Sequence, residues 1–296
     1  MSAEATLEAP TALPSRPTVG RGRGRRTAGL VARYVLLTFL AAVILFPIYM
    51  TIVNSLLRPD VIAAKPPTLF PENPQWDSYS TAWTDGHLGD YLFTSFVQTI
   101  SITVGQVVTA ILAAYAFAFL AFPFKRTIFV LFLATMMVPF EVVFFNNLQT
   151  IVDLGWYDTY AGLIVPFLAT GFGAFLLRQA FLTVPRDLRD AAALDGYGHW
   201  RFMARVVVPL NRPAVAALAV FSFLSAWNQY LWPLVVTRDD RLRTVQVGLR
   251  QLSRTSIDQI NVTFAGTVLA SIPLFILLVL FSKQLVRGLT AGAVKG

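Results

Sequence analysis

The side chains that could carry chemistry in this sequence are few, and three of them lie inside long apolar stretches. Glu141 lies within the apolar run 127–151, and Asn228 and Gln229 lie within the run 212–236. Because burying polar groups in hydrocarbon is costly, such side chains are candidates for a functional site. A carboxylate and two amides offer hydrogen-bond partners for substrate hydroxyl groups. They predict a tentative substrate path through the chain.

The motifs of several enzyme classes are absent from the sequence. It contains no cysteine and only two histidines, which leaves no thiol nucleophile, disulfide framework or histidine-based metal site. No lysine follows a glycine, so the phosphate-binding pattern GxxxxGK[ST] does not occur. The patterns GxSxG and HExxH are also missing. We therefore expect no catalytic residue and no bound cofactor or metal in this chain, and any ATP that drives it to be bound by another polypeptide.

The composition is that of a membrane protein. Of the 296 residues, 55% are hydrophobic and 14% are charged, against about 25% charged residues in a soluble domain. Apolar runs long enough to cross a bilayer recur six times. The expected spans run from about 34 to 53, 91 to 119, 127 to 151, 161 to 181, 212 to 236 and 262 to 281. The sequence therefore predicts an all-α integral membrane protein with six transmembrane helices.

Small residues recur every four positions in the second expected span, at Ala110, Ala114 and Ala118. This spacing places them on one face of a helix, where a neighbouring helix can approach closely. An alanine-rich span without such a contact is the alternative interpretation.

A polar segment, DAAALDGYGHWRFMARVVVP at 190–209, separates the fourth apolar run from the fifth. We expect two short helices joined by a turn. Asp187 is placed to cap the first helix, whose residues favour helix formation. Gly196 and Gly198 then interrupt it, with Gly196 as a left-handed terminator, and the second helix runs up to Pro209. The basic residues in or beside the segment are Arg186, Arg189, Arg201 and Arg205.

The spacing within this segment resembles the EAA loop of permeases in ATP-binding-cassette importers. That loop has the pattern Glu-Ala-Ala, three residues, Gly, nine residues, then Ile-x-Leu-Pro. The matching positions here are Asp190, Ala191, Ala192, Gly196, Val206, Val208 and Pro209. Asp replaces Glu and two valines replace Ile and Leu, while every spacing is kept. The resemblance implies that the loop 183–209 is a coupling helix that rests in a cleft of an ATPase subunit.

Further segments resemble the MalG-type permeases of carbohydrate importers and, within them, the permeases of Ugp importers. They are ILFPIY, YAGLIVPFLATGFGAFLLRQAF, AWNQYLWPL and LVRGL, and only about the first 28 residues lack a counterpart. The resemblance implies a type I ABC importer permease fold and import of sn-glycerol 3-phosphate or glycerophosphodiesters. The implied partners are a second permease subunit (UgpA-like), an ATPase homodimer (UgpC-like) that binds ATP and Mg, and an extracytoplasmic substrate-binding protein (UgpB-like).

The distribution of charge predicts the orientation. Six spans put both termini on one side, and 17 of the 24 Lys and Arg residues lie on that side with the polar loop, against seven on the other. The positive-inside rule makes the termini and the loop cytoplasmic, in a cytoplasmic or inner membrane. Because topology explains the net charge of +8, nucleic acid is not an expected partner. The expected domains are a disordered basic tail (1–30), the membrane domain (31–285) and a cytoplasmic tail (286–296).

Counting 1.5 Å per residue along straight helices places Glu141 about 21 Å and Asn228 about 24 Å from the cytoplasmic ends of their spans. We therefore expect these two side chains and Gln229 to face one cavity, although they could instead bond to other helices. Alternative functions are a permease for another sugar or oligosaccharide, a stand-alone secondary transporter or channel, and a membrane enzyme acting on lipid phosphates. The last would need a nucleophile or general base near one face, and no such cluster occurs.

Overall fold

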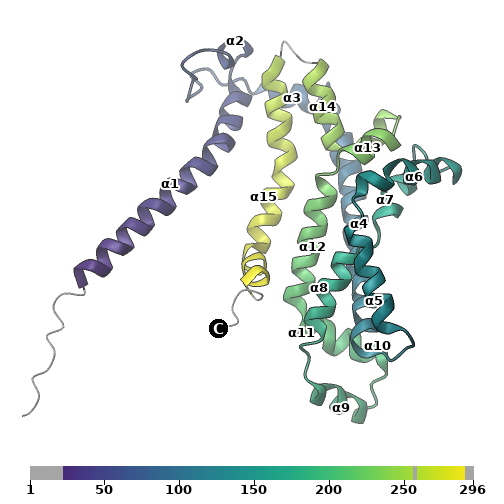
Figure 1. The fold of residues 1–296 in the computed structure, drawn as a ribbon. Coiled ribbons are helices and arrows are strands. Elements are labelled where there is room, and N and C mark those ends of the chain that lie inside the picture. The colour runs from purple at the N-terminus through teal and green to yellow at the C-terminus, as the bar shows by residue number, and fades with distance from the viewer. Residues whose placement is uncertain (1–22, 256–258, 291–296) are drawn as a thin grey trace, which may run out of the picture. The chain divides into compact units, whose positions relative to one another are not determined.

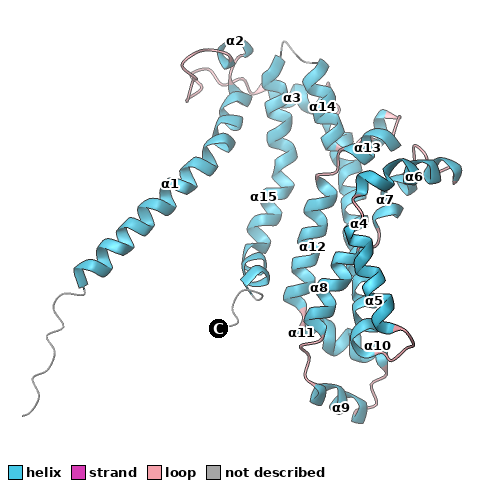
Figure 2. Cartoon of the chain, viewed as in Figure 1, coloured by secondary structure: helices cyan, strands magenta, loops and turns pink. Residues whose placement is uncertain are grey.

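All regular secondary structure in the described part of the chain, residues 23–255 and 259–290 of a computed structural model, is helical (Figure 2). The chain divides into two compact units, Met1–Met50 and Thr51–Gly296, with the boundary inside the first helix. That helix, α1 (Arg23–Leu56), begins seven residues before the expected end of the tail at residue 30. No proline occurs between Arg23 and Pro47 to stop a helix. Residues 1–22 of the predicted tail lie outside the described residues.

The second unit contains a bundle around α4 (Leu88–Phe119), which packs against α8 (Gly171–Phe181) and α12 (Arg212–Trp227). The last helix, α15 (Ile260–Thr290), packs against α12. It continues past the expected end of the span at 281, and residues 291–296 of the predicted tail lie outside the described residues. Figure 1 shows α9 (Arg186–Leu194) at one end of this bundle and α3 (Asp77–Thr84) and α14 (Val245–Thr255) at the other. These ends are called the α9 end and the α3 end below.

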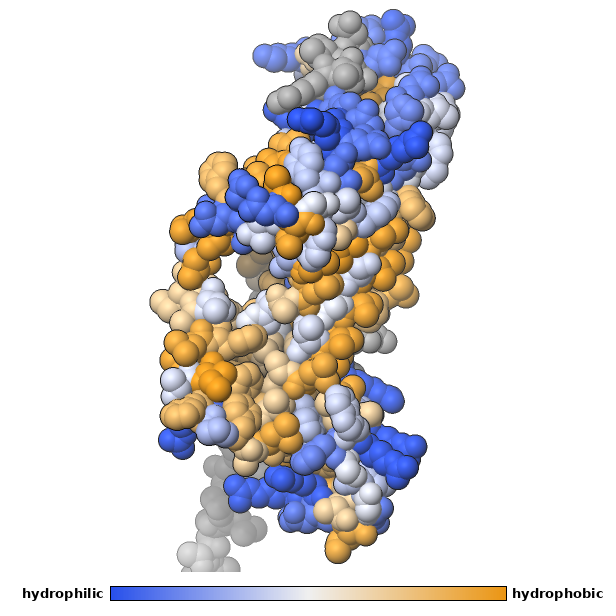
Figure 3. Space-filling view, turned by 90° about the vertical axis from the view of Figure 1, so that its right-hand side faces the viewer, coloured by the Kyte–Doolittle hydropathy of each residue, from blue (hydrophilic) through white to orange (hydrophobic). Residues whose placement is uncertain are grey.

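Three described helices are long and apolar enough to cross a membrane, and they lie at Gly29–Leu56, Leu88–Phe119 and Ile260–Ser282. Three pairs of helices pass the same test together but are bent, which raises the number of candidate spans to as many as six. On the face seen in Figure 3, apolar side chains form a broad band between two hydrophilic ends. The expectation of an all-helical membrane protein is therefore confirmed, but half of its spans are broken rather than straight.

The breaks follow from prolines and polar residues that the sequence places inside apolar runs. The third span bends by 96° between Lys125–Met137, formed by α5 (Lys125–Ala134) and a 3-10 turn, and α6 (Phe140–Asp153). Val138 is extended because it precedes Pro139, and this interrupts the helix. The fourth span bends by 41° between Tyr160–Phe167, which contains α7 (Tyr160–Ile164), and α8.

The fifth expected span is also interrupted. Helix α12 ends at Trp227, and three residues separate it from α13 (Leu231–Val236). The C-cap of α12 is Asn228, whose side-chain amide donates to the carbonyl of Leu224 at 2.8 Å. The backbone amide of Asn228 donates to the same carbonyl at 3.2 Å, so both donors of Asn228 close the last turn of α12. The straight-helix count therefore fails for Glu141, which lies beyond the 96° bend, whereas α12 is unbroken from Arg212 to its C-cap at Asn228.

The small residues of α4 lie at its contact with α8. Ala110 and Ala114 are buried, and a Cβ added at Gly173 of α8 would lie 3.0 Å from the Cβ of Ala110. The two helices are thus as close as their small residues allow, which confirms the prediction that this face of α4 contacts a neighbouring helix. Ala118 packs at the edge of the same cluster. This contact lies in the same hydrophobic cluster as Ala192 of α9.

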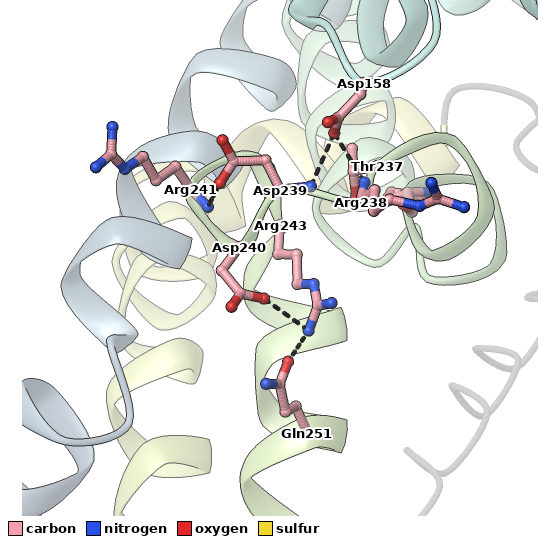
Figure 4. A network of polar contacts seen from close by, with 9 residues as sticks. Asp158, Thr237, Arg238, Asp239, Asp240, Arg241, Arg243 and Gln251 are labelled. Carbon is pink, nitrogen blue, oxygen red and sulfur yellow. Dashed lines mark hydrogen bonds and ion pairs between the residues drawn. The ribbon is translucent and has the colours of Figure 1, made fainter.

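The α3 end is tied together by hydrogen bonds between loops that are distant in sequence (Figure 4). The carboxylate of Asp158 accepts from the backbone amides of Arg238 and Asp239 at 2.7 and 3.0 Å, and its own amide donates to the carbonyl of Val236. Asp240 pairs with Arg243 at 3.0 Å, and Arg243 also donates to Gln251. The segment between the first two expected spans, residues 54–90, contains α2 (Pro59–Ile62) and α3.

Candidate functional site

The segment that matches the EAA pattern forms two helical halves joined by a turn, as expected. The first half is α9, and the second comprises α10 (His199–Phe202), a π-helical turn (Met203–Val207) and α11 (Val208–Leu210). The N-cap of α9 is Pro185, and no side chain caps it. The expectation that Asp187 caps this helix is wrong, because Asp187 lies inside the first turn. There its negative charge interacts favourably with the positive end of the helix dipole.

The turn between the halves depends on Gly196, which has a φ of +74°. The amide of Tyr197 donates to the carbonyl of Ala192 at 2.8 Å, and the amide of Gly196 donates to Ala193 at 3.1 Å. These two bonds are the pair that defines a Schellman motif, in which the residue after the cap is left-handed. Gly196 therefore fixes the direction in which the chain leaves α9.

The two halves are anchored on the bundle by buried residues. Ala192 of α9 is 6% exposed and belongs to the same cluster as Phe202, Tyr115 and Phe181. The hydroxyl of Tyr115 on α4 is hydrogen-bonded to Nδ1 of His199 at 2.9 Å. The segment is therefore held on α4 both by apolar packing and by a polar contact.

The second half meets α12 at an angle of 81°. Pro209 has no amide hydrogen to donate to the preceding helical turn, and a π-helical turn precedes it. Asn211 lies at the corner and is 8% exposed. Its side chain donates to the carbonyl of Val207 at 2.8 Å, and its own carbonyl accepts from Val215 at the start of α12. A short, hydrogen-bonded corner thus joins this segment to α12.

The outward surface of the segment is unusually apolar for a polar loop. Leu194 is 91% exposed and Trp200 is 72% exposed, although neither lies in an apolar run of the sequence. Asp190 and Ala191 are also exposed, and a Cβ at Gly196 would meet nothing within 4 Å. Large apolar side chains that a protein leaves exposed are typical of surfaces that meet a partner.

The three expected substrate-path residues do not gather at one cavity among the described residues. Glu141 is exposed in the first turn of α6 and forms no ion pair with a described residue. Asn228 is exposed, and its carbonyl oxygen accepts from Gln246 of α14 at 3.4 Å. Gln229 is half-buried, and its carbonyl oxygen accepts from the amide of Gln98 at 2.7 Å.

Aromatic side chains connect the start of α6, where Glu141 lies, with α13, which follows Asn228 and Gln229. Phe140, which precedes Glu141, lies 5.9 Å from the ring of Trp232 on α13. Trp232 is buried and donates to the carbonyl of Gly162 at 3.0 Å. The start of α6 therefore packs against α13, but the 96° bend directs α6 away from the bundle (Figure 1).

Sequence reasoning missed Gln98, which is 1% exposed inside α4. A glutamine within the second apolar run is itself a signal, because an amide buried in a membrane span needs a partner. Tyr115 and His199 were missed as a pair for another reason, since 84 residues separate them and no local pattern relates them.

Comparison with known proteins agrees with this geometry. Residues 88–291 match the family model described as binding-protein-dependent transport system inner membrane component. A relative from Rhizobium meliloti (strain 1021), named sn-glycerol-3-phosphate transport system permease protein UgpE, is 39% identical over 259 residues. That match covers 83% of this chain and 91% of the relative. A protein of the same name from Yersinia pestis bv. Antiqua (strain Antiqua) is 36% identical over 264 residues, which cover 86% and 94% of the two chains.

Two solved structures share the fold. The first is a chain of a bacterial ABC transporter involved in the import of the acidic polysaccharide alginate, with a TM-score of 0.78 and 24% identity. It covers 90% of this chain and 99% of its own. The second is a chain of a bacterial alginate ABC transporter in complex with an alginate pentasaccharide-bound periplasmic protein, with a TM-score of 0.61 and 14% identity over 86% of this chain and 94% of that one. The expected type I ABC importer permease fold is confirmed, and the chain belongs to the family of inner-membrane components of binding-protein-dependent transport systems.

Proposed function

We propose that this chain is one of two permease subunits of an ATP-driven importer for sn-glycerol 3-phosphate or glycerophosphodiesters. The substrate class follows from the UgpE relatives, which are 36–39% identical over most of the chain. The other subunits are a UgpA-like second permease, a UgpC-like ATPase homodimer that binds ATP and Mg, and a UgpB-like extracytoplasmic substrate-binding protein. A permease for another sugar importer is the alternative, since the alginate transporter shares the fold.

The observation that carries this proposal is the coupling segment, residues 183–209. It combines an anchored inner face, through Ala192, with an outer face from which Leu194 projects. We assign docking of the ATPase to this outer face, with Asp190, Ala191, Ala192, Gly196 and Pro209 shaping it. ATP-driven closure of the ATPase dimer then moves the segment, and the hydrogen-bonded corner at Asn211 passes the movement to α12.

The orientation belongs to the same proposal. Both termini and the α9 end face the cytoplasm, since 17 of the 24 Lys and Arg residues lie on that side of the expected topology. The α3 end then faces the extracytoplasmic side and receives the loaded binding protein. Alternating access requires that the two states of the permease differ in their free energy of interaction with the ATPase and the binding protein.

The substrate path runs past the break between α12 and α13. Asn228 and Gln229 have amide groups there, and the oxygen of Gln229 is already held by Gln98, which leaves its NH₂ group as a donor for a hydroxyl or phosphate oxygen. Glu141 would repel an anionic substrate, and we assign it to ordering of the gate at the start of α6.

Co-purification of the ATPase with the tagged full-length chain tests the coupling assignment. Leu194→Glu removes no packing within this chain, because the side chain is 91% exposed, yet it places a charge where an apolar contact is proposed. Burial of a leucine contributes about 1.5–3 kcal/mol, so retention of the ATPase should fall by about 10- to 150-fold. Leu154→Glu, at a 53% exposed position after α6, is the matched control and should leave retention unchanged. Equal retention in both variants would contradict the assignment.

A further inference from the structure

The α9 end carries a basic cavity that the coupling role does not use. This cavity, of about 750 Å³, lies between the turn after α4 and both halves of the coupling segment. Its polar lining consists of Lys125, Arg189 and His199, and no carboxylate is among its described lining residues. Its apolar walls are the last residue of α4, Phe119, and the turn residues Leu120, Ala121 and Phe122.

The basic side chains of this cavity have N–H groups that form no hydrogen bond with a described residue. The ammonium of Lys125 donates one bond, to the carbonyl of Leu120 at 2.8 Å, which leaves two N–H groups. Arg189 forms no ion pair with any described residue, although Asp190 lines a neighbouring groove with it. When the hydroxyl of Tyr115 donates to Nδ1 of His199, the neutral ring carries its proton on Nε2 and can donate as well.

The helix geometry adds a second reason to expect an anion. Lys125 and Arg126 occupy the first turn of α5, which contains no acidic residue. Positive side chains are unfavourable at this end of a helix, because the helix dipole and the free backbone N–H groups are positive there. An anion held near the start of α5 would offset both charges, and helix N-termini are common sites for phosphate.

A second cavity, of about 410 Å³, continues from the first and is apolar. It shares Leu120 and His199 with the basic cavity and extends along α4. Leu112 of α4, on its wall, is 41% exposed and lies inside a candidate membrane span. The remaining lining residues are Tyr115, Ala116, Trp200 and Met203. A basic cavity thus adjoins an apolar one that runs along a membrane helix.

We propose that the two cavities together bind one anionic phospholipid. Its phosphate group contacts Lys125, Arg189 and His199, and one acyl chain occupies the apolar cavity beside Leu112 and Trp200. Arginine and lysine are the side chains that bind phosphate oxygens most strongly. Basic pockets between membrane helices are typical of headgroup recognition. Inorganic phosphate shares the headgroup chemistry but leaves the apolar cavity unexplained.

Such a lipid would link parts of the chain that are otherwise separate. Lys125 begins α5, Arg189 lies on α9, and His199 begins α10. One phosphate group held by all three would tie both halves of the coupling segment to the turn at the membrane boundary. The position of the segment would then depend on the anionic lipid content of the membrane.

Native mass spectrometry of the purified full-length chain tests the proposal, with phosphatidylglycerol and phosphatidylcholine as probes. We expect phosphatidylglycerol to be retained, and the double variant Lys125→Gln with Arg189→Gln to weaken its retention about tenfold or more. Arg126→Gln is the matched control, because Arg126 is exposed, lies in the same turn of α5 and does not line the cavity. It should change retention less than about twofold, and Lys125→Arg should keep it.

Hydrogen exchange of the segment 186–202 is the second measurement, on the same chain in nanodiscs. Exchange should slow when phosphatidylglycerol replaces phosphatidylcholine, in the wild type and in Arg126→Gln but not in the double variant. The proposal is overturned if lipid retention is equal in all variants, or if millimolar inorganic phosphate slows exchange while phosphatidylglycerol does not. It is also overturned if the double variant keeps its lipid but no longer retains the ATPase in the co-purification assay. That result would make the cavity part of the interface with the ATPase.

Discussion

Replacement of Gly196 by serine isolates the backbone geometry of the coupling segment. The φ of +74° costs a residue with a side chain about 1–2 kcal/mol. A Cβ at this position meets nothing within 4 Å, so no steric overlap adds to that cost. The segment should relieve the strain by opening its turn and breaking the bond between Tyr197 and Ala192. The ATPase must then restore the turn when it docks, which should weaken its binding by about 5- to 30-fold.

The matched control is serine at Gly198, two residues away on the same surface. Its φ of −73° is open to any residue, and its Cβ also meets nothing within 4 Å. Serine is favoured at the N-cap that Gly198 provides for α10, so Gly198→Ser should bind the ATPase like the wild type. The assay is the Kd of purified ATPase for the permease in nanodiscs. Similar affinities for the two serine variants would refute the left-handed turn as the basis of docking.

Three further predictions concern topology and the substrate path. Single cysteines are introduced at Ser80 and at Leu194 of this cysteine-free chain, and intact cells are treated with an impermeant thiol reagent. Only the cysteine at Ser80 should be labelled, and labelling at Leu194 alone would contradict the proposed orientation. Asn228→Ala should lower uptake of sn-glycerol 3-phosphate by about fivefold, because one hydrogen bond is worth about 1 kcal/mol, while ATPase activity stimulated by the loaded binding protein persists; wild-type uptake would place the path elsewhere. Glu141→Gln should raise basal ATPase activity or reduce assembly without changing the preference for glycerol 3-phosphate over maltose, and a changed preference would contradict a gating role.

The coupling segment could be predicted because its determinants are local. The spacing from Asp190 to Pro209 and the positive φ of Gly196 depend on residues close together in the chain. The same holds for the small-residue face of α4, where the repeat at Ala110 and Ala114 identified the close contact with α8. Local propensity and periodicity are the information that one sequence carries most directly.

The substrate path could not be placed from the sequence, because it depends on the bends. Pro139 predicts a break in the third span, but not its angle of 96° or the contact that α6 then makes, in which Phe140 packs on Trp232, a residue far away in the chain. The bond between Gln98 and Gln229 spans 131 residues and is likewise non-local. Depth along a straight helix was therefore a poor guide to which polar groups meet.

Reconstituted transport tests the central claim most directly. The chain is incorporated into proteoliposomes with its second permease, its ATPase and its binding protein, and uptake of labelled sn-glycerol 3-phosphate is measured with and without ATP on the ATPase side. The account predicts uptake that requires ATP, the ATPase and the binding protein together, and that Leu194→Glu abolishes while Leu154→Glu does not. Uptake by this chain alone, without an ATPase and driven only by a substrate or ion gradient, would contradict it.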